Sequence, residues 1–139
     1  MKKLTALVLP MLVFAACSVS LNAPSITDLK LCSQITGDLC SSDSTTFQPV
    51  ETSLYATAIY NYAEANESVK VTWNYVGGNP DIQGPLEIAS ADIKIPEGTV
   101  FNMKGTIEQQ GPWPTGNYEV VLTTVSGKVA ALKKSFSVQ

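Results

Sequence analysis

The chain has 139 residues, 15% of them charged, and a formal net charge of −3 that arises from 9 basic and 12 acidic side chains. It contains no histidine, and every basic residue is a lysine. These features predict one main domain, and they exclude Ser-His-Asp and Cys-His catalytic sets, histidine-based zinc sites and arginine clamps for phosphate. An acidic chain without a basic cluster also indicates that nucleic acid is not a partner.

The first residues have the pattern of an export signal. Two lysines follow Met1, residues 4–14 are apolar apart from Thr5, and small residues come next. The apolar run is too short to cross about 30 Å of hydrocarbon. It therefore predicts a secretory signal peptide over residues 1–16 and not a membrane span.

The residues before Cys17 make this prediction more specific. The segment Val13-Phe14-Ala15-Ala16-Cys17 resembles the lipobox of bacterial lipoproteins, although leucine is more usual at the position of Phe14. The resemblance implies that Cys17 becomes the first residue and carries lipid such as palmitate, and each buried CH₂ would contribute about 0.8 kcal/mol to membrane binding. Ser18, in place of an aspartate, implies the outer membrane, with the domain facing either the periplasm or the cell surface. The alternative is an ordinary signal peptide that is cut nearby.

Two further cysteines, Cys32 and Cys40, form an even pair in what would be an oxidising compartment. We expect a disulfide between them that closes a small loop; two free thiols, or less plausibly a metal pair, are the alternatives. Residues 17–28 are small and polar and predict a tether. Residues 29–47 then predict a disulfide-stapled segment with at most a short edge strand.

The rest of the chain, residues 48–139, alternates between apolar and polar side chains as β-strands do. Turn residues separate the predicted strands, which cover residues 53–62, 68–76, 86–95, 99–107, 117–125 and 129–138. Within residues 86–95 the alternation changes phase, which predicts a bulge or two short strands. Six or seven short strands without a helical pattern predict an all-β, antiparallel β-sandwich.

Two short motifs point to a particular sandwich. Trp113-Pro114-Thr115-Gly116-Asn117-Tyr118 precedes the penultimate predicted strand, and Phe136-Ser137-Val138 ends the last one. This layout resembles immunoglobulin-like and fibronectin type III-like domains of bacterial surface proteins, and the resemblance implies an Ig-like fold with a tyrosine corner at Tyr118. The motifs are structural, so they imply a fold and not a function.

The loop over residues 111–117 holds the candidate ligand-binding residues Trp113, Pro114 and Asn117. An indole between two prolines could be an exposed stacking platform for a sugar or a peptide. The alternative, which we favour, is that Trp113 folds over the end of the sandwich and fills its core.

Other chemistry has weaker support. Asp28, Asp38 and Asp43 could hold Ca²⁺, but they do not match the spacing of a calcium loop. Carboxylates scattered at strand ends, such as Glu87 and Glu108, are more typical of a solvated surface than of a glycosidase. The sequence therefore indicates no catalytic residue, no metal and no cofactor.

We expect a non-catalytic binding or scaffolding module that is anchored by lipid at the outer membrane and contacts another envelope protein. The alternative is a periplasmic inhibitor of a lysozyme or a protease that inserts residues 111–117 into an enzyme cleft. The inhibitor hypothesis requires an exposed Trp113.

Overall fold

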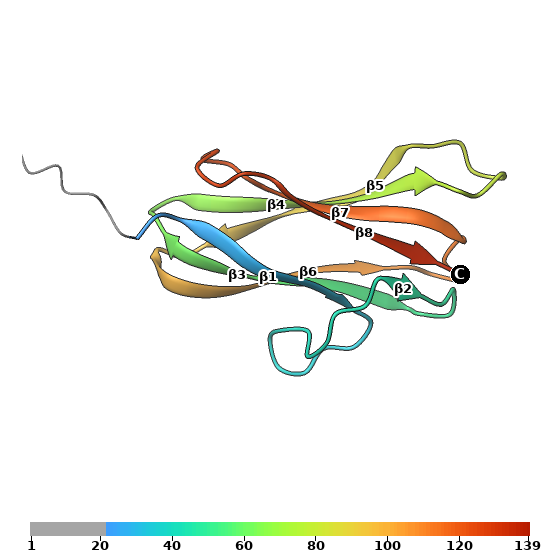
Figure 1. Cartoon of the computed structure of the whole chain (residues 1–139), viewed down its shortest axis with the longest axis horizontal. Coiled ribbons are helices and arrows are strands. Elements are labelled where there is room, and N and C mark those ends of the chain that lie inside the picture. Colours follow the sequence, from blue (N-terminus) through green and yellow to red (C-terminus); the bar gives the residue numbers. More distant parts are fainter. Residues whose placement is uncertain (1–21) are drawn as a thin grey trace, which may run out of the picture.

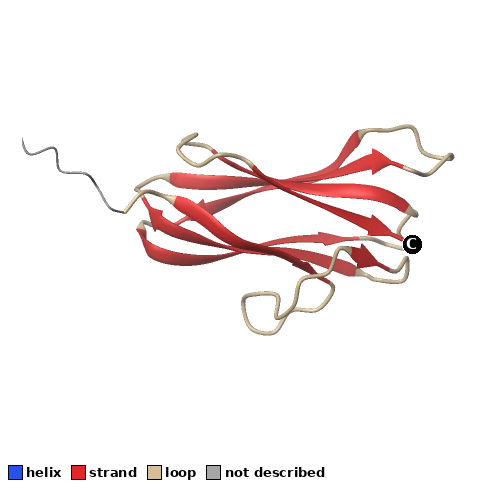
Figure 2. Cartoon of the chain, viewed as in Figure 1, coloured by secondary structure: helices blue, strands red, loops and turns tan. Residues whose placement is uncertain are grey.

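The structure is a computed structural model that describes residues 22–139. The predicted signal peptide and the predicted lipidation site at Cys17 lie outside the described residues. The described part consists of strands and loops (Figure 2). Its strands are β1 (Ser25–Cys32), β2 (Thr46–Phe47), β3 (Ser53–Ala63), β4 (Glu67–Gly77), β5 (Leu86–Ile95), β6 (Gly98–Glu108), β7 (Gly116–Thr124) and β8 (Leu132–Val138).

The strands form two sheets that pack as layers (Figure 1). One sheet has the order β1-β3-β6, and the other has the order β2-β8-β7-β4-β5. All pairings are antiparallel except that of β2 with β8. The predicted all-β, Ig-like sandwich is confirmed. β2 is the short edge strand that was allowed within residues 29–47, and β1 is a strand that was not expected. In the described part of the chain, no helix is long and apolar enough to span a membrane.

Strand β1 corrects the predicted domain boundaries. It begins at Ser25, inside the predicted tether, and pairs with β3 as an edge strand of the three-stranded sheet. Asp28 has a φ of 58°, and the pairing register shifts between Thr27 and Lys30. This bulge moves the buried side chains from one parity to the other, so the strand has no regular alternation in the sequence. The sandwich therefore begins at Ser25 and not at residue 48.

Strand β5 contains the bulge that the change of phase predicted. The register of β4 with β5 shifts after Trp73, so that Ala89 pairs with Trp73 while Glu87 pairs with Asn74. Ile88 is the extra residue. The bulge brings Leu86, which pairs with the inward-facing Tyr75, onto the same face of the sheet as Ala89.

The core forms where alternation is strict. Val69, Val71, Trp73 and Tyr75 of β4 are all buried, and the residues between them are more exposed. In β3, Leu54, Ala56, Ala58 and Tyr60 are buried on the inner face, and Thr57 on the outer face is buried as well. Tyr62 has a φ of 56° and is exposed, and Ala63 is buried in its place. Tyr62 therefore leaves the inner face, because a left-handed residue ends the alternation.

The sandwich has two distinct ends. Strand β1 starts at the proximal end, where the turns at residues 64–66, 96–97 and 125–131 lie. The loops over residues 78–85 and 109–115 lie at the opposite, distal end (Figure 1). We use these two names below.

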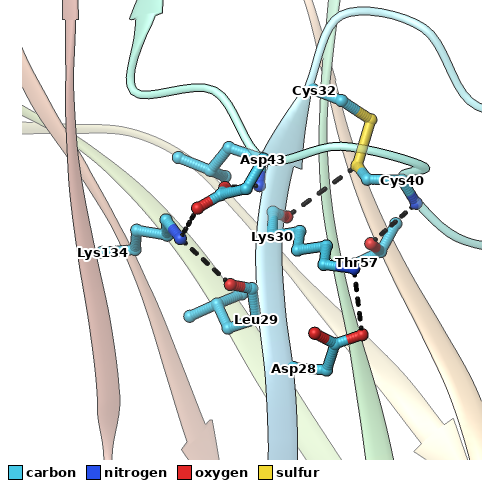
Figure 3. A network of polar contacts seen from close by, with 9 residues as sticks. Asp28, Leu29, Lys30, Cys32, Cys40, Asp43, Thr57 and Lys134 are labelled. Atoms are coloured by element: carbon cyan, nitrogen blue, oxygen red, sulfur yellow. Dashed lines mark hydrogen bonds and ion pairs between the residues drawn. A yellow bond between two sulfur atoms is a disulfide. The ribbon is translucent and has the colours of Figure 1, made fainter.

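The disulfide loop, residues 33–45, packs beside β1 and β3. Cys32 and Cys40 are bonded, with a Cα–Cα distance of 5.8 Å, which confirms the predicted pair. The Cys40 amide donates to Thr57 Oγ1 at 3.0 Å (Figure 3), and Thr57 is buried beneath the loop. The loop is thus fixed to the outer face of the three-stranded sheet and is part of the folded unit.

Lys134 connects the two sheets on this side. It lies on β8, on the inward parity of the strand, at a point where β2 does not cover the edge. Its Nζ donates to Leu29 O at 3.1 Å and pairs with the Asp43 carboxylate (Figure 3). Burial would raise the pKa of Asp43, but hydrogen bonds from Lys134 and from the Leu31 amide outweigh burial and hold the pKa below its usual value. Lys134 thus ties β8 to β1 and to the disulfide loop.

Removing the disulfide tests how much the loop contributes to the fold. We expect Cys32→Ala with Cys40→Ala to lower the free energy of unfolding by about 2–3 kcal/mol, because the bond restricts the unfolded chain. Urea unfolding under non-reducing conditions measures the change, and adding a reductant to the native protein should reproduce it. An unchanged midpoint would show that the non-covalent contacts alone hold the loop.

Candidate functional site

The distal end is organised by Tyr118 at the start of β7. The Tyr118 hydroxyl donates to Pro114 O at 2.6 Å, which is the predicted tyrosine corner. Gly116, with a φ of 146°, allows the sharp turn: a Cβ there would lie 2.8 Å from Tyr75 Cε2. The Trp113 amide also donates to Pro49 O at 2.8 Å. The two hydrogen bonds therefore fix the adjacent residues Trp113 and Pro114 in the middle of the loop.

Trp113 is buried, with only 3% of its surface exposed. Its ring meets Tyr118 edge to face at 5.9 Å, and Tyr118 in turn stacks on Phe136 at 5.3 Å. Burial, and to a smaller degree the neighbouring Tyr75, raises the pKa of Tyr118. Trp113 is thus the core plug that we favoured, and the exposed indole that the inhibitor hypothesis requires is absent from this loop.

The neighbouring loop over residues 78–85 is tied to the same corner. The Asn79 amide donates to the Tyr75 hydroxyl at 2.8 Å, and Asn79 Nδ2 donates to Thr115 O at 3.0 Å. A Cβ on Gly84 would lie 2.7 Å from the Tyr75 ring, so glycine permits the chain to pass close to it. Two loops from different parts of the sequence therefore form one wall.

A cavity of about 270 Å³ lies at this end between the free edges of the two sheets, formed by β5 and β6. Apolar side chains of β5 and the two loops make up much of its lining: Leu86, Ile88, Ala89, Ile82, Trp113 and Pro114. The remaining lining comes from Tyr75, Tyr118, Ile107, Glu108 and Gln109. Leu86 and Ile88 are 40% and 37% exposed, so apolar surface continues from the cavity to the outside.

The structure brings together two of the three predicted ligand-binding residues. Trp113 and Pro114 line the cavity, whereas Asn117 is exposed and lies beside Glu119 and Ser135 in a separate surface depression. The sequence did not identify the contributions of Ile82 and β5. The one sequence signal for β5 was the change of phase in residues 86–95, because regular alternation could not bury all of its apolar side chains; Ile82 had no such signal.

Two of the three aspartates considered for calcium, Asp28 and Asp43, have lysine partners. Asp28 lies 3.4 Å from Lys30 Nζ, and Asp43 pairs with Lys134. Among residues 22–139, no group of three or more histidine, cysteine, aspartate or glutamate side chains is placed to hold a metal ion.

Glu67 is a buried carboxylate at the proximal end, which makes it a further candidate for chemistry. Its oxygens accept hydrogen bonds from the Tyr60 hydroxyl at 2.9 Å, from the Ser68 amide at 3.0 Å and from the Ser126 hydroxyl and amide. Burial would raise the pKa of Glu67, but these hydrogen bonds hold it below the usual value. Burial and the carboxylate raise the pKa of Tyr60 to about 12. Glu67 thus links β3, β4 and the turn after β7, which is a structural role.

Comparison with known proteins supports the fold only. No family model matches the chain, and no curated protein matches its sequence. A mutant β-glucosidase from Listeria innocua in complex with laminaribiose matches with a TM-score of 0.51 and 14% identity, over 84% of this chain and 16% of the enzyme. The complex of the β-glucosidase with isofagomine matches with a TM-score of 0.50 and 10% identity, over the same shares.

The alkylpurine DNA glycosylase AlkC from Pseudomonas fluorescens, bound to DNA, matches with a TM-score of 0.49 and 11% identity, over 85% of this chain and 31% of the glycosylase. The chain therefore spans less than a third of the length of each of these proteins.

The Glu67 network predicts a specific response to acid. Since the folded pKa of Glu67 lies below its usual value, its contribution to stability is present at neutral pH and is lost as the pH falls through the folded pKa. We expect wild type to lose more stability than Glu67→Gln as the pH drops below about 4.5. Urea unfolding between pH 7 and pH 3 measures both curves, with the exposed Glu97→Gln as a matched control. Parallel curves for wild type and Glu67→Gln would contradict the assignment.

Proposed function

We propose that this protein is a non-catalytic binding module, held at the membrane by lipid on Cys17, that presents its distal cavity to a partner in the cell envelope. The observation that carries the proposal is the position of the cavity. It lies at the end of the sandwich opposite to the start of β1, and the chain enters the fold at the proximal end (Figure 1).

The distance along the chain supports this arrangement. Ser25 follows Cys17 by eight residues, which span at most about 28 Å when extended. A lipid on Cys17 would therefore hold the proximal end close to the membrane and leave the distal end directed away from it. A binding surface at the distal end would remain accessible to a partner.

The chemistry of the cavity favours binding over catalysis. Glu108 is the one carboxylate among the described residues that line it, whereas glycoside hydrolysis ordinarily uses a pair. Its other side chains are mostly apolar and aromatic, as in sites that hold a ligand by burial.

Lipidation is tested at Cys17. We expect the full chain to incorporate labelled palmitate and to sediment with membranes, and Cys17→Ser to lose both properties. If Cys17→Ser were still processed and membrane-bound without label, the anchor would be of another kind.

The binding role is tested by placing a photoreactive residue at Glu108, on the rim of the cavity, or at Glu97, in an exposed proximal turn. Irradiation of intact cells should give a discrete covalent adduct from position 108 and none from position 97. Equal adducts from both positions, or none from position 108, would contradict the proposal.

A further inference from the structure

We propose that the distal cavity and the free edge of β5 together bind an extended, positively charged peptide segment, which adds a strand to β5 and places an aromatic side chain in the cavity. This inference rests on the proposed function, and it specifies the chemistry of the partner.

The first observation is the free edge. Strand β5 pairs with β4 on one side and is the last strand of its sheet, so the other edge of its ten residues has backbone groups available for pairing. Free edges of this kind accept an extended peptide through main-chain hydrogen bonds, and an adjoining pocket supplies specificity. The opposite edge of the sandwich is occupied by β1, β2 and the disulfide loop.

The second observation is the match between the cavity and one large side chain. A cavity of 150 Å³ holds a benzene molecule, so the present volume of about 270 Å³ suits an aromatic side chain. Trp113, Tyr75 and Tyr118 in its lining offer ring faces and edges for aromatic pairing. Ile88 lies at the β5 bulge and lines the cavity, so a strand added at this edge passes the opening.

Trp113 supplies a further sign of a missing partner. Its Nε1 is buried and, among residues 22–139, has no hydrogen-bond acceptor. An unpaired buried donor costs about 1–3 kcal/mol. A carbonyl of a bound segment that reached Nε1 would satisfy it.

The third observation is charge. Glu108 lines the cavity, and Asp81 precedes the lining residue Ile82. Neither carboxylate takes part in the four ion pairs found among the described residues. The lysines of residues 22–139 lie along the strands or at the proximal end. An aromatic side chain flanked by lysines would therefore complement both the cavity and its rim.

The probe is the labelled peptide acetyl-Lys-Val-Trp-Val-Lys-amide, in which the two lysines and the tryptophan share one face of a strand. Fluorescence polarisation with the full chain in detergent measures its affinity. One comparison peptide replaces both lysines by glutamate, and another replaces tryptophan by alanine. Two more carry N-methyl groups, either on the two valines or on the tryptophan and both lysines, so that each peptide lacks the residue N–H donors of one edge.

Two variants of the protein test whether the peptide occupies the cavity. Ala89→Phe places a ring in the cavity, because Ala89 lines it and pairs with the inward-facing Trp73. Ser90→Phe adds the same ring to the other face of β5, and urea unfolding confirms that both variants are folded. We expect Ala89→Phe, the glutamate peptide, the alanine peptide and one of the methylated peptides each to weaken binding by about tenfold or more, and Ser90→Phe to leave it unchanged.

Equal binding to wild type and Ala89→Phe, equal binding of the lysine and glutamate peptides, or no binding at millimolar peptide would each overturn the inference. If both methylated peptides bound as tightly as the unmethylated peptide, the proposal that the peptide adds a strand to β5 would be refuted. If the peptide fails while the adduct at position 108 persists in cells, the binding function stands and the basic peptide is the wrong ligand. If both fail, the proposed function fails as well.

Discussion

The distal half of this molecule depends on Tyr118. Its hydroxyl donates to the carbonyl of Pro114, and its ring stacks on Phe136 of the neighbouring strand and meets Trp113 edge to face. A phenol that is hydrogen-bonded at its hydroxyl and packed against other aromatic rings is held in one position, and so is the loop to which it donates. The wall of the cavity formed by Trp113 is therefore rigid, whereas the wall formed by the edge of β5 is partly exposed.

The two long sides of the sandwich differ in how the gap between the sheets is covered. On one side, the gap between the sheets is covered by the disulfide-bonded loop and by the ion pair between Lys134 and Asp43. On the other side, β5 and β6 leave the gap open at the distal end, and the cavity occupies it. A domain of this size has a small hydrophobic core. Because the disulfide loop and the ion pair stabilise one side of the sandwich, the other side can contain an open cavity while the domain stays folded.

The sequence predicted what depends on strict alternation and on short motifs. The strands around Trp73 and Tyr118, the cysteine pair and the tyrosine corner are all local patterns, and the structure confirms them. It could not predict β1, because the left-handed Asp28 breaks the alternation of that strand. The cavity was hidden for a different reason: Ile82 and Trp113 come together only through the topology, and no spacing in the sequence records that contact.

The direction of β1 has a mechanical consequence. The strand enters at the proximal end and runs antiparallel to β3, with hydrogen bonds perpendicular to both strands. A pull on the chain before Ser25, resisted by a load at the distal end, would act along the axis of β1. Such a force slides the strand past its neighbour and strains all of its hydrogen bonds together, whereas peeling would break them one after another. The sandwich is thus oriented to bear tension between its two ends.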